Sequence, residues 1–395
     1  MHPSEEVYCE KGDDLVGKTI VMGITGSIAA TECFYTIREL IRYGATVKVA
    51  MTPAASRLVA PDAMEFACGT YPVLELTGGT EHVDFVGHPG DAALLLIYPA
   101  TANTVSKIAN GIDDTTVTSM ATVALGADVP VAVAPAMHES MYRNPAVAEN
   151  IARLKSWGVE FIGPRTDGVR AKVATRDEVV SRTLAIVSDS PLKGRRILVI
   201  GGRGEEPIDD MRVVTNRSSG EMAVSLALRA FQQGADVELW MGGCSVQIPD
   251  YIRTVRFGSV SDLEAMIPRI DHDAVLVPAA LSDFAPEPVS GKISSDSALE
   301  LRMEPVPKML PLIAERCPVV VGFKAESGLS EQDLCDRARS RMDSYGLYAV
   351  VANDVSCAGA PESSVCIVTR DGVRRSRGGK RVVADDILDV LKGSL

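Results

Sequence analysis

Short runs of aliphatic and β-branched residues alternate with longer helical segments along most of this chain, and this alternation restricts the fold more than any other feature. Such runs, separated by helices, are typical of a parallel sheet whose two faces are covered. In the first half we predict buried strands at Lys18–Gly23, Thr46–Met51, Ala92–Tyr98 and Pro130–Ala134, with helices between them, for example at Ala29–Tyr43 and Pro145–Trp157.

A polar segment with a proline, Ser188–Lys193, interrupts this alternation, which then starts again. The 395 residues are also more than one hydrophobic core usually organises. We therefore predict an α/β protein of two doubly wound domains, residues 1–188 and 189–395. The second half is expected to contain a helix at about 220–234 and strands at 195–202, 236–243, Ala274–Pro278, Val319–Phe323 and Tyr348–Ala352.

The composition limits the partners of the chain. A net charge of −12 disfavours nucleic acid and anionic membranes, although backbone amides and a few lysines can still hold a phosphate locally. The longest apolar run, AALLLIYPATA, contains Pro99 and is too short to span a membrane. Eight cysteines are scattered without a CxxC pair, and the N-terminus has no apolar signal-peptide core. We expect a cytoplasmic protein with reduced thiols that acts on small molecules.

A glycine-containing turn, GITGSIAA at Gly23–Ala30, joins the first predicted strand to the first helix. Glycine lets the backbone approach a phosphate, and Ser27 with the amides of the helix N-terminus can bind it. An ordinary tight turn fits this string equally well. The string TANT follows another strand and supplies Thr101, Asn103 and Thr104 at the same edge of the sheet, where ligands of α/β folds bind.

Together these strings resemble the FMN-binding segments of the flavin-containing cysteine decarboxylases, a homo-oligomeric family. The loop PAMHESMYRNPAVAENI at Pro135–Ile151 resembles the substrate loop of the same family. The resemblance implies a flavodoxin-like flavoprotein domain whose substrate contacts are Met137, His138 and Met141, with His138 gripping a carboxylate where the family usually has asparagine. The implied FMN contacts are Gly26, Ser27, Thr52, Thr101, Asn103 and Thr104.

The resemblance also implies a catalytic histidine. His82, in TEHVDF, occupies its position, and a neutral imidazole there could accept the thiol proton while FMN oxidises the thiol. His88 is the competitor and is more typical of a solvated loop. In the mechanism that the resemblance implies, oxidation of the thiol gives a thioaldehyde, which accepts the electrons left when CO₂ departs. The resulting ene-thiolate is then reduced by the flavin and protonated. The stretch Gly163–Thr175 lacks the family's lid cysteine, as archaeal-type members do, which leaves Lys172, water or a group of another subunit as the proton donor.

A second string, MRVVTNRSSGEMA at Met211–Ala223, follows the restart of the pattern. The GGxG turn before it is compatible with any dinucleotide-binding domain. The longer pattern EPIDDMR-x₃-NRSSG is more specific and resembles the central loop of phosphopantothenate–cysteine ligase. The resemblance implies that Arg212 contacts substrate, that Asn216 acts on an acyl-cytidylate, and that Ser218–Gly220 form an anion-binding turn. Glu221 replaces the lysine of the family.

The string VLVPAALSDFAPEPVSGKISS at Val275–Ser295 resembles the ligase segment that ends in a lysine-bearing KI motif, and VVANDVS at Val350–Ser356 resembles a later signature. Asp283 would contact the nucleotide or its Mg²⁺, and Lys292 would stabilise charge on the phosphates of CTP. Phe323 would stack on the base, whereas Arg341 and Tyr345 stand where the family has lysines. The implied CTP contacts are Asp283, Lys292, Val306, Pro307, Lys308, Met309, Phe323, Arg341 and Tyr345.

From about Thr19 onward the chain therefore resembles the bifunctional enzymes of coenzyme A synthesis, which join cysteine to 4′-phosphopantothenate and then decarboxylate the product. The resemblance implies FMN, Mg²⁺ and CTP, and a homo-oligomer built from decarboxylase trimers and ligase dimers, which a dodecamer would combine. A decarboxylase for another cysteine or peptide substrate, a non-catalytic flavin-binding protein and a flavin prenyltransferase are the alternatives. His82, Asn216 and Lys292, all present, favour the bifunctional enzyme.

Overall fold

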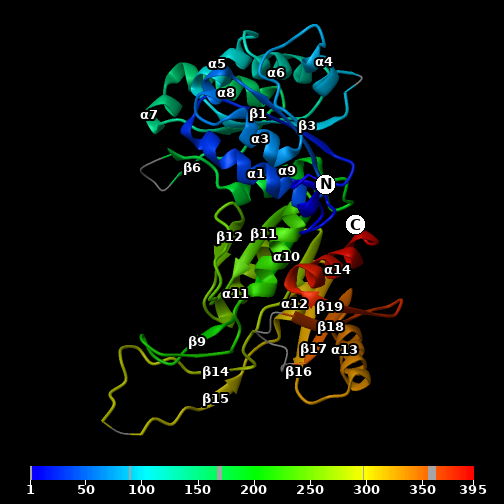
Figure 1. Ribbon diagram of the computed structural model, residues 1–395. Coiled ribbons are helices and arrows are strands. Elements are labelled where there is room, and N and C mark those ends of the chain that lie inside the picture. Colours follow the sequence, from blue (N-terminus) through cyan, green and yellow to red (C-terminus); the bar gives the residue numbers. More distant parts are fainter. Residues whose placement is uncertain (1, 89, 167–170, 297, 355–361) are drawn as a thin grey trace. The chain divides into compact units, whose positions relative to one another are not determined.

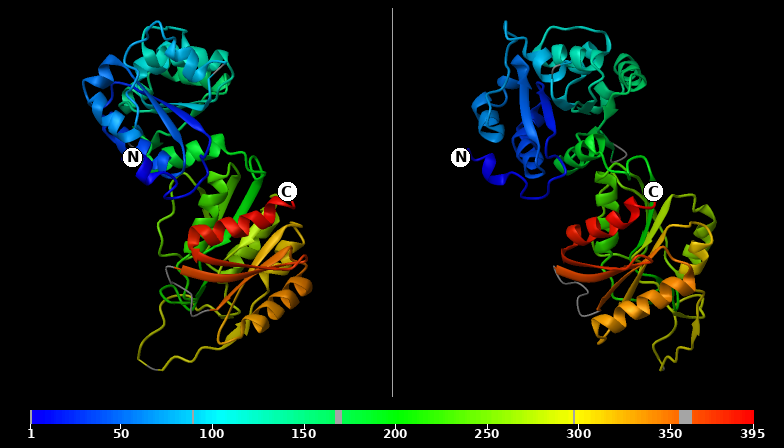
Figure 2. Two further views of the ribbon diagram at one scale, coloured as in Figure 1. Left: turned by 45° about the vertical axis from the view of Figure 1, so that its right-hand side comes forward. Right: turned by 90° about the vertical axis from the view of Figure 1, so that its right-hand side faces the viewer.

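The structure is a computed structural model that describes residues 2–88, 90–166, 171–296, 298–354 and 362–395. The chain forms two compact units, Met1–Ser188 and Asp189–Leu395. Each unit is a β-sheet with helices on both faces (Figures 1 and 2), so the predicted two-domain α/β fold class is confirmed. Among the described residues, no helix has the length and apolar character needed to cross a membrane.

The first unit contains a five-stranded parallel sheet in the order β2-β1-β3-β4-β5. This is the flavodoxin-like order, and its topological switch point lies between β1 and β3. Every residue of β1 is buried because helices cover both faces of the sheet. The strands, close to their predicted positions, are β1 Thr19–Ile24, β2 Thr46–Met51, β3 Ala92–Ala100, β4 Val131–Pro135 and the short β5 Glu160–Phe161.

Two hydrophobic cores attach the helices of the first unit to the two faces of its sheet. The helix predicted over Ala29–Tyr43 begins as a 3₁₀ turn and becomes α-helical only at Cys33. One face carries α1 Cys33–Arg42, α3 Pro61–Cys68 and α9 Arg176–Val187, and the other carries α4 Glu81–Val86, α5 Ala102–Ala109, α6 Thr116–Gly126 and α8 Pro145–Ser156. The shorter elements are η1 Glu5–Val7, η2 Ile28–Glu32, α2 Pro53–Ser56, α7 Glu139–Tyr142, β6 Arg165–Thr166 and β7 Ala171–Lys172.

The second unit contains an eight-stranded sheet in the order β12-β11-β8-β13-β16-β17-β18-β19. Its first six strands are parallel and have the Rossmann order, with the switch point between β8 and β13. The last two strands form an antiparallel hairpin that the sequence pattern did not predict. The strands are β8 Arg196–Gly201, β11 Asp236–Met241, β12 Arg253–Arg256, β13 Ala274–Val277, β16 Val320–Glu326, β17 Ala349–Asp354, β18 Glu362–Thr369 and β19 Val373–Gly379.

Helices again cover both faces of this sheet, each over its own hydrophobic core. On one face lie α10 Glu221–Gln232 and α14 Lys380–Lys392, which pack against each other. On the other face lie α11 Val260–Met266, η3 Ile267–Arg269, α12 Met309–Ala314 and α13 Glu331–Tyr345.

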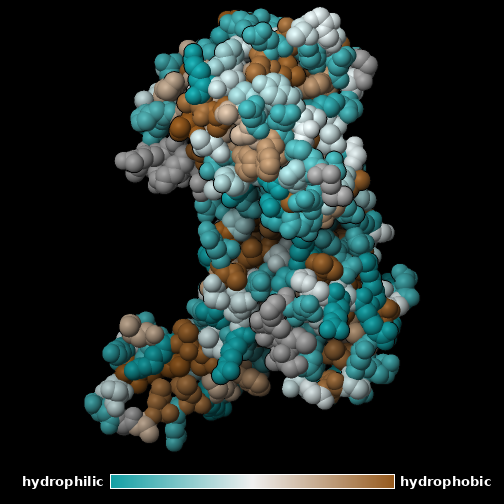
Figure 3. Space-filling model, viewed as in Figure 1, coloured by the Kyte–Doolittle hydropathy of each residue, from teal (hydrophilic) through white to brown (hydrophobic). Residues whose placement is uncertain are grey.

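Two pairs of short strands extend away from this sheet as an arm, which we define as residues 205–215 and 284–305 without residue 297 (Figure 1). The strands of the arm are β9 Glu205–Pro207, β10 Val213–Thr215, β14 Phe284–Pro286 and β15 Met303–Pro305. Hydrophobic surface follows the arm in Figure 3. Its large exposed apolar side chains are Met211, Val213, Phe284, Val289, Leu299 and Leu301.

Candidate functional site

A cavity of about 390 Å³ lies at the carboxyl edge of the first sheet, where the topology changes direction. Ligands of open α/β sheets bind at this position. The lining residues are Gly26, Thr52, Pro53, Ala54, Arg57, Thr101, Asn103, Thr104, Lys107, Thr115 and Thr118.

Three threonines of this lining also begin the helices that surround the cavity. Thr52 Oγ1 accepts the amide of Ala55 at the start of α2 (3.2 Å), and Thr101 Oγ1 accepts the amide of Thr104 at the start of α5 (3.3 Å). Thr115 forms a capping box with Thr118 at the start of α6. Because the N-termini of α5 and α6 both open at this cavity, their unpaired amides and dipoles favour an anionic ligand.

Hydroxyl groups fix the loops that hold these helices. Thr25 Oγ1, after β1, donates to the carbonyl of Pro99 (2.6 Å) and accepts the amide of Thr101 (3.1 Å). On α6, Thr116 Oγ1 donates to the carbonyl of Met51 at the end of β2 (2.9 Å). The cavity is therefore held by buried hydrogen bonds between three neighbouring strand ends.

The two charged side chains in this lining, Arg57 and Lys107, are both cations. Lys107 Nζ pairs with Asp114 at 2.6 Å, whereas Arg57 is exposed and has no partner among the described residues. No carboxylate lines the cavity within the described part of the chain. The cavity thus combines helix amides, hydroxyls and positive charge, which suits a phosphate group.

The structure brings together five of the six residues predicted to contact FMN: Gly26, Thr52, Thr101, Asn103 and Thr104. Ser27 lies beside the lining and caps η2 by accepting the amide of Ala29 (3.4 Å). Sequence reasoning missed Arg57, Lys107, Thr115 and Thr118. The TxxT spacing of a capping box was the available signal for the last two.

The histidine predicted to be catalytic lies on α4, outside the described lining of the cavity. Its ring is partly buried, and Nδ1 is buried without a hydrogen-bond partner among the described residues. A buried polar atom without a partner is unusual in a protein interior. His88, by contrast, is exposed.

The predicted substrate contacts Met137, His138 and Met141 lie in the loop after β4 and in the short helix α7 that follows it. Met137 packs against the core of this face, while Met141 is 48% exposed. His138 is the N-cap of α7, and its Nδ1 accepts the amide of Ser140 (3.3 Å), which assigns the proton of the neutral ring to Nε2. None of the three lines the cavity. The side chain of Lys172 and part of the lid, residues 167–170, lie outside the described part of the chain.

A second cavity, of about 410 Å³, lies at the carboxyl edge of the second sheet. Five cations line it, whereas Asp283 is the sole carboxylate among the described lining residues. In a chain of net charge −12, this concentration of positive charge indicates a polyanionic ligand. The cations are Arg217, Lys308, Lys324, Arg341 and Lys380.

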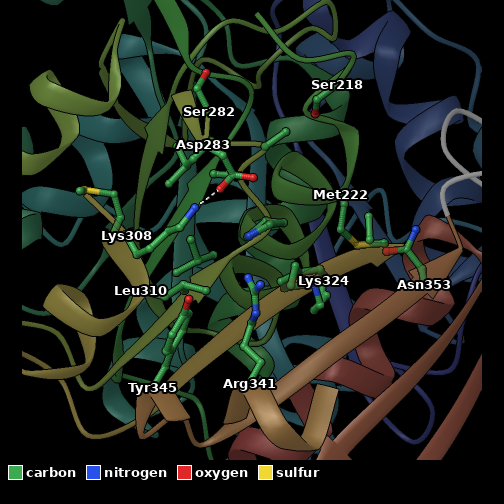
Figure 4. Close-up of a pocket in the computed structure, with 18 of the residues that line it drawn as sticks. Ser218, Met222, Ser282, Asp283, Lys308, Leu310, Lys324, Arg341, Tyr345 and Asn353 are labelled. Carbon is green, nitrogen blue, oxygen red and sulfur yellow. Dashed lines mark hydrogen bonds and ion pairs between the residues drawn. The ribbon is translucent and has the colours of Figure 1, made fainter. Parts of the chain in front are cut away.

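The lining of this cavity comes from both sides of the sheet edge. In Figure 4, Lys308, Leu310 and Tyr345 lie on one side, and Met222 and Asn353 lie on the other. Asp283 pairs with Lys308, and both side chains are largely exposed. The guanidinium of Arg341 lies 5.3 Å from the ring centre of Tyr345, a cation–π contact.

Seven of the nine predicted CTP contacts line this cavity: Asp283, Pro307, Lys308, Met309, Phe323, Arg341 and Tyr345. Val306 packs against the neighbouring core, and Lys292 lies in the arm, exposed and outside the described lining. The lining residues that sequence reasoning did not propose include Arg217, Met222, Lys324, Asn353, Ser363, Val365 and Lys380. The end of the predicted signature Val350–Ser356, residues 355 and 356, lies outside the described residues.

Arg212 and Asp209 hold the segment that carries Lys292. Arg212 pairs with the fully buried Asp209 carboxylate and donates to the carbonyl of Ile293 (3.2 Å), while Asp209 accepts the amide of Ile293 (3.0 Å). Burial would raise the pKa of Asp209, but amides of Met211, Ile293 and Arg212 and the Arg212 guanidinium outweigh it and lower the pKa to about 2. The loop that carries Lys292 is therefore attached to Asp209 and Arg212 at the next residue, Ile293.

Asn216 lies next to the cavity. Its Nδ2 donates to the carbonyls of Ala280 and Leu281, both at 3.1 Å, and these two residues line the cavity. The helix after it, α10, has Gly220 as its N-cap, and the φ of this residue, +82°, favours glycine. Of the three residues predicted to form the turn before this helix, Ser218, Ser219 and Gly220, the last is the N-cap, and Ser219 Oγ accepts the amide of Glu221 (3.3 Å).

In the described parts of the chain, no cluster of three His, Cys, Asp or Glu side chains could hold a metal ion. A metal at the second cavity would therefore depend mainly on ligand oxygens and water, as Mg²⁺ commonly does with nucleotide phosphates.

Two family models cover almost the whole chain. Residues 9–188 match the Flavoprotein model, and residues 192–394 match the model described as DNA/pantothenate metabolism flavoprotein C-terminal domain. The fold and these matches define a two-domain flavoprotein with a flavodoxin-like first unit and a Rossmann-like second unit.

Relatives that match along their whole length identify the family more specifically. The coenzyme A biosynthesis bifunctional protein CoaBC of Thermococcus kodakarensis is 43% identical over 407 residues and covers 100% of both chains. The protein of the same name from Methanocaldococcus jannaschii is 34% identical and covers 99% of this chain and 98% of its own. The chain belongs to the CoaBC family of coenzyme A biosynthesis bifunctional proteins. The predicted family and the predicted bifunctional enzyme are confirmed.

Proposed function

We propose that residues 189–395 join cysteine to 4′-phosphopantothenate with CTP, through an acyl-cytidylate, and that residues 1–188 decarboxylate the product to 4′-phosphopantetheine with FMN. The observation that carries this proposal is that each unit of one CoaBC-family chain has its own cation-lined cavity at the carboxyl edge of its sheet. Both proposed ligands carry phosphate, and both cavities offer positive charge.

The residues of the first cavity fit FMN. Gly26, the capping threonines and the first-turn amides of α5 and α6 would hold the phosphate and the ribityl chain, with Arg57 and Lys107 supplying charge. FMN, when bound, supplies the two-electron oxidation of the substrate thiol and the later reduction. His82, at the position of the family's catalytic histidine, would take the thiol proton, and His138 would donate Nε2–H to the substrate carboxylate.

Gly26→Ala is expected to weaken FMN binding. A Cβ at residue 26 would lie 2.5 Å from Ala54 Cβ, so the turn after β1 and helix α2 would have to separate where they line the cavity. Overpacking of this kind costs about 1–3 kcal/mol, and we expect most of it to appear as lost FMN affinity. Quenching of flavin fluorescence on titration measures that affinity.

Gly78→Ala is the matched control, because a Cβ at residue 78 meets nothing within 4 Å. If Gly26→Ala bound FMN as tightly as Gly78→Ala, the turn after β1 would not contact the cofactor.

The second cavity fits a nucleoside triphosphate. Four of its five cations, all except Lys380, can balance the phosphates, and Phe323 and Met222 give it apolar walls for a base. Asp283 would contact Mg²⁺ that is held mainly by the phosphates. Asn216, beside the carbonyls of Ala280 and Leu281, would act on the acyl-cytidylate, Arg212 would contact 4′-phosphopantothenate, and Lys292 would stabilise charge on the phosphates.

Two measurements on the purified protein test the proposal. The visible absorbance spectrum should show an oxidised flavin, and incubation with 4′-phosphopantothenate, cysteine, CTP and Mg²⁺ should yield 4′-phosphopantetheine, CO₂, CMP and pyrophosphate. Absence of flavin would contradict the assignment of the first unit. Ligation with ATP in preference to CTP would contradict the assignment of the nucleotide.

We also propose a homo-oligomer in which the first unit forms trimers and the second forms dimers, combined in a dodecamer. The exposed apolar side chains of the arm support a contact between second units, because large exposed apolar patches usually mark interaction sites. Light scattering on the full chain would measure the mass, and a monomer would contradict the proposal.

A further inference from the structure

The predicted nucleotide contacts do not explain one part of the lining of the second cavity, which we call the lobe. It lies at the end of β17 and the beginning of β18, and it is lined by Asn353, Ser363, Val365 and Lys380. Because β18 and β19 run antiparallel, Gly379 pairs with Glu362 and returns the chain to the carboxyl edge of the parallel strands. Helix α14 therefore starts beside the cavity, with Lys380 as its first residue.

Apolar side chains of one face of the sheet form the walls of this lobe. Phe323, Met222 and Val365 all belong to the core beneath α10 and α14. Phe323 and Met222 are only partly buried, and Val365 is 6% exposed. An aromatic ring and a thioether with exposed faces are suited to a flat heterocycle.

The polar groups of the lobe are few. Lys380 Nζ donates to Ser363 Oγ, which uses one of the three donors of the ammonium group. No carboxylate pairs with Lys380 in the described part of the chain. A lysine in the first turn of a helix is also disfavoured by the helix dipole, so the stability of α14 does not explain this residue.

Asn353 supplies an acceptor to the same lobe. Its Nδ2 donates to the carbonyl of Asp354 (3.1 Å), so its Oδ1 remains available as an acceptor. The lobe thus offers the remaining ammonium hydrogens of Lys380 and the carbonyl oxygen of Asn353 at the rim of an apolar slot.

We propose that Lys380 and Asn353 determine the base specificity of the second unit by reading the edge of cytosine. The ammonium group of Lys380 donates to O2 and N3 of the base, and Oδ1 of Asn353 accepts from the exocyclic amino group. Uracil presents an N–H at the position of N3 and a carbonyl in place of the amino group, so it mismatches both residues. This inference rests on the proposed function, in which the cavity holds a nucleoside triphosphate.

Lys380→Met tests the inference on the full-length protein, because methionine keeps most of the length of the side chain and removes its charge and donors. We expect the affinity for CTP, measured by calorimetry with Mg²⁺, to fall about tenfold or more, the loss typical of a hydrogen bond from a charged donor. The affinity for UTP should change much less, so the preference for CTP over UTP should largely disappear. Lys380→Arg, which keeps donors, should retain part of that preference.

Lys392→Met is the matched control at the other end of α14, where the lysine pairs with Asp389. It should bind both nucleotides as the unchanged protein does. If Lys380→Met weakened CTP and UTP equally, Lys380 would be a charge for the phosphates and the inference would fail. If the unchanged protein bound no nucleoside triphosphate, the proposed function itself would fail.

Discussion

A His82→Asn variant is expected to release no measurable CO₂ from 4′-phosphopantothenoylcysteine while it still binds FMN and still ligates cysteine. His82 lies outside the described lining of the FMN cavity, and its Nδ1 is buried without a partner among the described residues. Asparagine preserves much of the shape but cannot take up a proton. Loss of a general base costs about 10²–10⁴-fold in rate, and CO₂ release with isolated substrate measures it.

His88→Asn is the matched control for this experiment, since His88 is exposed and lies six residues further along the chain. Decarboxylation should remain normal in that variant. If instead His82→Asn released CO₂ normally and His88→Asn did not, the base would have to be reassigned to His88.

Lys292→Ala and Asn216→Asp are expected to stop the ligase at two different steps. Loss of Lys292 should prevent measurable formation of the acyl-nucleotide, because the phosphates would lose a stabilising cation. We expect the rate of this step to fall about 10²–10³-fold. Asn216→Asp should let the acyl-nucleotide form and accumulate, because the intermediate is then not consumed by cysteine. Pyrophosphate release with and without cysteine separates the two results.

Arg302→Ala controls for charge on the arm, because Arg302 is a 90% exposed cation of the same arm and pairs with Glu304. It should leave both steps unchanged. Identical behaviour of Lys292→Ala and Asn216→Asp in the pyrophosphate assay would show that the two residues do not divide the reaction in this way.

Much of the fold could be predicted because buried parallel strands leave continuous apolar runs in the sequence. Thr46–Met51 is observed as predicted, and Ala274–Val277 differs by one residue at its end. The hairpin β18–β19 was missed because its second strand, VRRSRGG, is basic and largely exposed. Its position depends on pairing with β18, which no local pattern reveals.

The candidate sites were predictable to the extent that their residues follow strand ends. Thr52, Thr101 and Thr104 meet at one cavity because parallel strands deliver their carboxyl ends to one edge. Lys380 could not be predicted to line the second cavity. It lies there only because the antiparallel hairpin β18–β19 brings the chain back to that edge of the sheet. Lys292 also could not be placed, because its position depends on contacts between Asp209 and Ile293, 84 residues apart in sequence.

The anchoring of the arm by Asp209 has a consequence for acid tolerance. The pKa of its carboxyl is lowered from 3.8 to about 2 by the amides and the guanidinium around it. Stability from a lowered carboxyl pKa is fully present above the ordinary value and is lost only as the pH falls towards the lowered one. The attachment of the loop that carries Lys292 should therefore persist unchanged through mildly acidic and neutral conditions. A decline of ligation on mild acidification would have to originate in another titrating group.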